Sequence, residues 1–172
     1  MAVVLGFVPP GQAAQKPSES QLKAAYLYNF AKFIQWPDDA FPGKDSPLVL
    51  GLLGENCLAA ELDLLAGRKV RDRRIEVRKF TNAGDVKGCH LLYISSTFEN
   101  KLKDVLQNFR VRPIVTVGDD NNFSSLGGVV QFVSRRDRLR FIVNLGVAKA
   151  NNIKVDSQLL SLAVEVVEAE GE

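Results

Sequence analysis

The sequence predicts an α/β fold: a single-domain sandwich with a mostly parallel sheet, a C-terminal antiparallel hairpin and helices on both faces. Short, almost continuous apolar runs alternate along the chain with segments of helical periodicity, an order typical of parallel sheets. Near the C-terminus, two strand-like runs follow each other so closely that they must pair antiparallel. The 172 residues, 46% of them hydrophobic and 24% charged, suffice for one such domain with a sizeable core.

The N-terminal residues 1–13 have features of a secretion signal. A short apolar run follows Met1, and the small residues Gly11 and Ala13 suit the small-x-small pattern of signal cleavage. The basic segment that opens such signals is missing, because no Lys or Arg lies within this stretch. We expect a truncated signal peptide; the alternative is a tail without function. Residues 14–19 are mostly polar and are expected to form a linker.

The first predicted helix follows this linker. Ser18 or Ser20 can cap its start, and Pro37 stops it by biasing Trp36 away from helical dihedrals. Apolar residues recur at helical spacing and form one stripe, which predicts a helix that faces the core. The stripe consists of Leu22, Ala25, Tyr26, Phe30 and Phe33.

The middle of the chain predicts alternating strands and helices. Almost continuous apolar runs indicate buried strands, whereas Ile75 and Val77 alternate with charged residues and indicate a strand with one polar face. Gly67 ends the first of the intervening helices. The predicted strands span residues 48–53, 73–80, 90–95 and 113–118, and the helices span residues 57–66 and 98–109.

The C-terminal third predicts a different order. Residues 129–133 and 139–143 form the hairpin, and residues 145–151 form a short helix. A final helix, capped by Asp156 or Ser157, then presents a broad apolar face. That face comprises Leu159, Leu160, Ala163, Val166 and Val167. One domain is thus expected over residues 20–168, followed by a frayed acidic tail at 169–172.

The two cysteines, Cys57 and Cys89, have two interpretations. An even number of cysteines in an exported protein favours a disulfide, whereas both thiols would be reduced in the cytosol. A bond would stabilise the fold by about 3–4 kcal/mol in the chain-entropy model. However, one cysteine follows the first sheet strand and the other precedes the third, so they belong at opposite ends of a parallel sheet. We expect the disulfide, although this placement argues against it.

The composition offers no catalytic or metal site. The only histidine, His90, lies in an apolar strand, and its neighbour Cys89 must point to the opposite face. No Gly-x-Ser-x-Gly elbow is present, and one histidine with two distant cysteines cannot hold zinc. Residues 119–122 are acidic and amidic but lack the ligand spacing of a calcium loop. We therefore expect no enzyme, no metal and no cofactor.

Binding of a small ligand is one hypothesis for the function of this protein. In parallel sheets, ligands gather where the strands end, and Gly54, Gly118 and Asp119 lie at two such ends. No complete dinucleotide fingerprint and no phosphate-binding loop of the Walker type are present. A cleft formed by these three residues would make the protein a ligand-binding sensor module.

Arginines are concentrated in two segments, residues 68–79 and 135–140. Aromatic residues for base stacking are almost absent from both, and the net charge is only +2, so a nucleic-acid partner is not expected. The segments either protect strand edges or bind an acidic partner. From the second segment we predict Arg138 and Arg140, with the neighbouring Asn144, as partner-binding residues.

Three segments in order resemble the YfiR-like family of bacterial periplasmic proteins. The first is KAAYLYNFAKFIQWP at 23–37 and the second is GCHLLYIS at 88–95. The third is the block formed by residues 127–133, 139–144 and 153–163. Together they cover the chain from about residue 18 to 164.

The resemblance implies an α/β sandwich and a regulator that is not an enzyme. The family's founding member acts in the periplasm, restrains an inner-membrane diguanylate cyclase and so keeps cyclic di-GMP low. It is itself sequestered by an outer-membrane lipoprotein. We accordingly expect a soluble periplasmic homodimer that binds such a cyclase or another membrane sensor protein, with a lipoprotein as a further partner.

Overall fold

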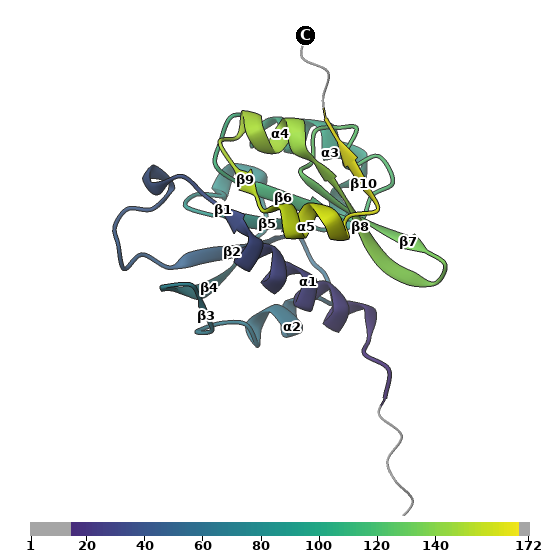
Figure 1. Cartoon of the computed structure of the whole chain (residues 1–172), viewed down its shortest axis with the longest axis horizontal. Coiled ribbons are helices and arrows are strands. Elements are labelled where there is room, and N and C mark those ends of the chain that lie inside the picture. Colours follow the sequence, from purple (N-terminus) through teal and green to yellow (C-terminus); the bar gives the residue numbers. More distant parts are fainter. Residues whose placement is uncertain (1–14, 169–172) are drawn as a thin grey trace, which may run out of the picture.

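The computed structural model describes residues 15–168, which form an eight-stranded sheet with helices on both faces (Figure 1). The sheet order is β10-β8-β7-β6-β5-β2-β4-β3. Strands β2, β4, β5, β6 and β7 run parallel, and β7 and β8 form an antiparallel hairpin. The predicted fold class is therefore confirmed. The predicted signal peptide and acidic tail lie outside the described residues.

The elements follow each other along the whole described chain. The strands of the large sheet are β2 (Leu48–Leu53), β3 (Lys69–Val70), β4 (Arg73–Phe80), β5 (Leu91–Ile94), β6 (Val115–Gly118), β7 (Val130–Arg135), β8 (Arg138–Asn144) and β10 (Glu165–Val167). A separate two-stranded sheet pairs β1 (Ile34–Gln35) with β9 (Lys154–Val155). The α-helices are α1 (Glu19–Phe33), α2 (Ala59–Asp63), α3 (Leu102–Gln107), α4 (Leu145–Ala150) and α5 (Ser157–Leu162). Three 3₁₀ helices complete the part of the chain that the structure describes: η1 (Asp38–Ala40), η2 (Ala83–Asp85) and η3 (Ser96–Lys101).

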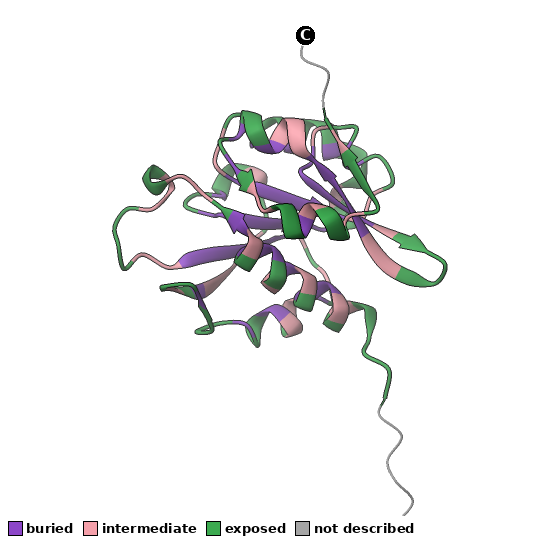
Figure 2. Cartoon of the chain, viewed as in Figure 1, coloured by how far each residue is buried: buried purple, intermediate pink, exposed green. Residues whose placement is uncertain are grey.

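The sheet separates two hydrophobic cores, because successive side chains of a strand point to opposite faces. On one face Leu50 of β2 packs with side chains of α1, α2, α4 and α5. On the other face Val49 packs with side chains of α3. In Figure 2 the buried residues accordingly concentrate in the central strands, whereas the hairpin tip is exposed.

Helix α1 lies across β7 and β8 and packs on them through four aromatic side chains. Phe30 is fully buried, with its ring centroid 5.1 Å from that of Phe141 and 5.8 Å from that of Phe132. Tyr26 contacts the same two rings, and its hydroxyl donates to the carbonyl oxygen of Leu139 at 3.1 Å. Aromatic pairs of this kind add to the stabilisation from buried area.

The boundaries of α1 agree only in part with the expectation. Ser18, one of the two predicted caps, accepts a hydrogen bond from the Gln21 backbone amide and starts the helix. The helix ends at Phe33, before the predicted Trp36, because Ile34 is already extended and pairs with Val155. A tertiary strand pair, rather than Pro37, thus ends the helix.

Most central elements lie where the sequence places them, but the C-terminus differs. Strands β2 and β4 have the predicted bounds, and the hairpin and α4 are present. The predicted final helix is wrong beyond Leu162, because Val166 and Val167 belong to β10 and pair in parallel with β8. Helices predicted at 57–66 and 98–109 are shorter, and part of the second is the 3₁₀ helix η3.

His90, which the sequence places in an apolar strand without catalytic partners, has a structural role. Its Nδ1 accepts the backbone N–H of Val49 at 3.0 Å, which requires the proton on Nε2, 3.1 Å from the carbonyl oxygen of Ala40. The ring stacks on Phe41 with centroids 4.3 Å apart, and Trp36 Nε1 donates to the His90 carbonyl oxygen at 2.9 Å. His90 therefore ties the segment after α1 to the sheet.

The burial of His90 predicts that the protein becomes less stable as the pH falls below the ordinary pKa of histidine. Burial, with the positive charges of Arg73 and Arg78, lowers the pKa of His90 below its ordinary 6.5. The unfolded chain therefore binds this proton first as the pH falls below about 6.5, which favours unfolding. We expect urea denaturation to show lower stability at pH 5.5 than at pH 7, with at most about 1 kcal/mol of the loss due to this group. In His90→Asn this particular loss should disappear, and an unchanged slope would contradict the assignment.

Candidate functional site

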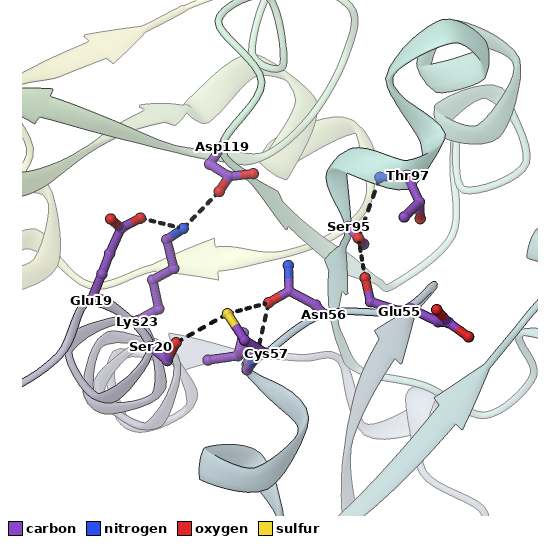
Figure 3. Close-up of polar contacts among 10 residues, drawn as sticks. Glu19, Ser20, Lys23, Glu55, Asn56, Cys57, Ser95, Thr97 and Asp119 are labelled. Atoms are coloured by element: carbon purple, nitrogen blue, oxygen red, sulfur yellow. Dashed lines mark hydrogen bonds and ion pairs between the residues drawn. The ribbon is translucent and has the colours of Figure 1, made fainter.

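A buried lysine lies where the carboxyl end of β6 meets α1. Lys23 Nζ contacts Asp119 Oδ2 at 2.6 Å and Glu19 Oε1, one helical turn earlier, at 2.7 Å (Figure 3). Burial opposes the charged ammonium, but the hydrogen bonds to the two carboxylates outweigh it and hold the pKa of Lys23 above its ordinary value. The amine therefore stays protonated and fixes α1 to the end of β6.

The hydroxyl of Tyr93 on β5 belongs to the same cluster. Tyr93 is fully buried, and its hydroxyl has no hydrogen-bond partner among residues 15–168. Burial and the nearby Asp119 carboxylate raise its pKa, so the phenol stays neutral. A buried hydroxyl without a partner is unfavourable, and a polar group that satisfies it would be stabilising.

A pocket of about 530 Å³ opens beside this cluster, between α1 and the hairpin. We call it the carboxylate pocket, because its charged lining consists of Glu19, Asp119 and Asp137 with the single lysine Lys23. Phe132 and Leu139 provide its apolar wall. Its volume is in the range of ligand sites, and it can receive a polar or cationic group.

The three residues predicted for a ligand cleft do not line one common cleft. Asp119 lines the carboxylate pocket, whereas Gly54 lines a separate pocket of about 280 Å³ beside β2 and β4. A Cβ atom on Gly118 would lie 2.3 Å from the ring of Phe123, so this glycine makes room for packing. Near Gly54, Ser95 Oγ donates to the Glu55 carbonyl oxygen at 2.6 Å and holds two loops together (Figure 3).

The predicted partner-binding residues are divided between surface and interior. Arg138 is exposed and Arg140 is half-buried, both on the β7–β8 hairpin, which projects from the sheet (Figure 1). Asn144 is 6% exposed, so it is no part of an exposed surface. Its Oδ1 accepts the Val147 amide and caps α4, and its Nδ2 donates to the Ser124 carbonyl oxygen.

The expected disulfide is absent, and both cysteines are free thiols. Cys57 follows the carboxyl end of β2 and is exposed beside Ser20, with 3.2 Å between Sγ and Oγ (Figure 3). Cys89 precedes β5 and is buried in the core on the α3 side. The two thiols therefore lie at opposite ends of the sheet, as the sequence already suggested, and a bond would need Cα atoms within about 7 Å.

The described residues offer no other constellation with obvious chemistry. No group of three His, Cys, Asp or Glu residues within 15–168 is placed to hold a metal ion. Burial raises the pKa of Cys89 to about 12, so this thiol is not a nucleophile at neutral pH.

Between residues 15 and 168, no helix combines the length and the apolar character needed to cross a membrane.

Lys23 and Tyr93 are not among the site residues predicted from the sequence. One local pattern indicates an ion pair of Lys23: it follows Glu19 by four residues on a helix that is otherwise predicted to face the core. Its second partner, Asp119, is 96 residues away, and no local pattern indicates that contact. Tyr93 resembles any other apolar residue of a buried strand.

Comparisons with known proteins give one family and several similar folds. A model of the YfiR/HmsC-like family (DUF4154) matches residues 20–164. No curated protein matches the sequence.

Two solved structures share the fold at 9% identity. The first is the ABC domain in complex with L-Trp from Streptococcus pneumoniae, with a TM-score of 0.56 over 84% of this chain and 60% of that one. The second is a conserved domain protein from Vibrio cholerae O1 biovar El Tor, with a TM-score of 0.54 over 87% of this chain and 60% of that one. This chain thus spans 60% of the length of each, and the likeness concerns the fold alone.

The free cysteines predict a clear pattern of thiol reactivity. In the folded protein without reductant, a chromogenic thiol reagent should modify Cys57 quickly and Cys89 only after unfolding in urea. Cys57→Ser should remove the fast reaction and leave the slow one. A protein without any reactive thiol in urea would instead contain the disulfide.

The buried ion pair predicts a large difference between two lysines. Lys23→Met leaves Asp119 and Glu19 without their cation and should cost about 1–3 kcal/mol in urea denaturation. Lys79 pairs with Asp63 at 2.7 Å, but both side chains are more than half exposed. Lys79→Met is therefore the matched control and should cost less than about 1 kcal/mol. Equal losses in the two variants would show that the Lys23 cluster does not support the fold.

Proposed function

Because this chain belongs to the YfiR/HmsC-like family, we propose that it binds and restrains an inner-membrane diguanylate cyclase and thereby lowers cyclic di-GMP. The family is regulatory, periplasmic and associated with diguanylate cyclase signalling. The match over residues 20–164 is the observation that carries this proposal. The mode of action is binding to a protein partner rather than catalysis.

The hairpin supplies a surface suited to such a partner. Opposite residues of β7 and β8 point to the same face, and the register pairs Arg135 with Arg138 and Val133 with Arg140. The three arginines thus share one face, and none forms an ion pair among the described residues. Arginine is favoured in interfaces because its planar guanidinium binds carboxylates with two hydrogen bonds. An acidic surface on the cyclase would complement this face.

Further parts of the proposal follow from the family. We place the protein in the periplasm after removal of a signal peptide, acting as a homodimer. A lipoprotein of the outer membrane would sequester it and so release the cyclase. Another membrane sensor protein in place of the cyclase would use the same surface.

A ligand-binding sensor is the second candidate function, and the carboxylate pocket favours it. The pocket lies at the carboxyl edge of a mostly parallel sheet, the usual place for ligands in such folds. L-Trp is a first compound to test, since the S. pneumoniae structure of similar fold is a complex with it. A rise in melting temperature with free metabolite and no protein partner would support this candidate.

The proposed function predicts that deletion of the gene raises cyclic di-GMP in the source bacterium. Restoring the protein with a complete signal peptide should return the level to normal, whereas a version kept in the cytosol should not. The measurement is intracellular cyclic di-GMP by mass spectrometry. An unchanged level on deletion would contradict the proposal.

The same strain can test the arginine face. Arg138→Glu with Arg140→Glu should abolish restoration, because two favourable charges become repulsive toward an acidic partner. Lys101→Glu with Lys103→Glu makes the same change of net charge near α3, away from the hairpin, and should restore normally. Full restoration by the double arginine variant would remove the hairpin from the binding surface.

A further inference from the structure

Strand β7 lies between β8 and β6, but part of it has no strand on the β6 side and so forms an open edge. Strand β8 pairs with β7 as far as Arg135, whereas β6 pairs only with Val130 and Gln131. Residues 132–135 therefore have a neighbouring strand on one side only. At about 3.3 Å per residue, this edge is about 13 Å long.

The open edge presents backbone hydrogen-bonding groups. In an antiparallel pair, the backbone groups of alternate residues point toward the partner strand and away from it. The Asn144 amide donates to the Val129 carbonyl oxygen, which lies opposite it in the register. The backbone N–H and C=O groups at every second position after Val129, on Gln131, Val133 and Arg135, therefore point toward β8. The N–H and C=O of Ser134 therefore point away from β8, to the open side. Ser134 is exposed.

Two pockets flank this edge, one on each face of the sheet. The carboxylate pocket lies on the α1 side, and a pocket of about 660 Å³, the arginine-face pocket, lies on the other. Asn121, Val133 and Ser134 line both, so the two pockets meet along the open edge. A strand added here would place successive side chains alternately into one pocket and the other.

The two sheet faces beside the open edge differ in charge. The arginine-face pocket contains Arg135 and Glu165, which balance each other, and Arg138 and Arg140 make the same sheet face positive beyond the pocket. In the carboxylate pocket three carboxylates outnumber Lys23, so negative charge dominates. A single strand added at the open edge could therefore complement both pockets only if its acidic and basic side chains lie on opposite faces.

The arginine-face pocket also contains a polar group without a partner. Ser124 is 6% exposed, and its hydroxyl forms no hydrogen bond among residues 15–168. It lines the pocket together with Gln131, whose Oε1 accepts the Ser124 amide at 3.0 Å. A carboxylate that enters this pocket would pair with Arg135, and a small shift of the Ser124 side chain would bring its hydroxyl within reach of the same carboxylate.

We propose that β7 binds an extended segment of a partner protein, which adds as a strand beside residues 132–135. The segment carries acidic and basic residues in alternation, with acidic side chains entering the arginine-face pocket and basic ones the carboxylate pocket. Main-chain hydrogen bonds to Ser134 provide affinity, and the two pockets provide specificity. That the segment belongs to the cyclase rests on the proposed function; the strand-addition site itself does not.

Two capped peptides of about eight residues test the site directly. In one, Glu and Lys alternate; in the other, four Glu precede four Lys. We expect only the alternating peptide to shift the amide resonance of Ser134 in NMR spectra and to slow its hydrogen exchange, because an incoming strand accepts that hydrogen. Equal behaviour of the two peptides, or no effect on Ser134, would overturn the proposal.

Matched variants separate the backbone and charge contributions. Ser134→Pro removes the outward N–H at a position where a strand tolerates proline, and Ser134→Ala retains it. We expect at least tenfold weaker peptide binding for the proline variant alone, provided that its circular dichroism matches that of Ser134→Ala. Arg135→Glu should likewise weaken binding about tenfold, whereas Arg136→Glu, in the turn and outside both pockets, should not.

The periplasmic region of the cyclase then tests the identity of the partner. If it binds and Ser134 exchanges more slowly, the segment belongs to the cyclase. If it binds without protecting Ser134 and binds both Ser134 variants equally, the proposed function stands and the strand-addition site is wrong for this partner. If it does not bind while the alternating peptide does, the proposed function fails and the site stands.

Discussion

The packing of α1 across β7 and β8 is the constraint on which the other features depend. Phe30 packs against the rings of Phe132 and Phe141, more than 100 residues later in the chain, and all three rings are shielded from water. Burial of aromatic surface makes a large favourable contribution to such a contact. It fixes the base of the hairpin against the helix. The position of the open edge and the shape of the carboxylate pocket both follow from it.

The Lys23 cluster continues this contact toward the N-terminus of α1, but by a different kind of interaction. A buried ammonium is unfavourable unless carboxylates replace its water, and Glu19 and Asp119 do so at 2.7 and 2.6 Å. Such a cluster adds little net stability, because the cost of removing its charges from water offsets most of their attraction, but its short contacts fix the orientation of the helix. It aligns the start of α1 with the end of β6. The carboxylate pocket and the arginine-face pocket meet beside this point, along the open edge of β7.

The hairpin carries an arginine-rich face, and on the opposite side of the sheet the carboxylate pocket contributes the carboxylates of Glu19, Asp119 and Asp137. A uniformly basic surface would attract many anionic partners, whereas opposite charges on the two faces of one strand select a particular pattern. The arrangement is suited to protein recognition. It also explains why counting charges along the chain identifies the arginines but not the site, since Glu19 and Lys23 come from α1 and Asp119 comes from the segment after β6.

The sequence by itself determined the fold class, the extents of β2 and β4, the hairpin, and the structural role of His90. These depend on local periodicity and on turn length, which a short window of residues contains. The tertiary structure alone decided the features that need distant pairing. Val166 and Val167 form a strand because β8 is there to pair with them, Asn144 is buried because it caps α4 beneath the Ser124 loop, and Lys23 meets Asp119 because α1 crosses the sheet. The cysteines stay apart for the same reason: the sheet places them at its opposite ends. The number of cysteines in a sequence does not indicate the distance between them.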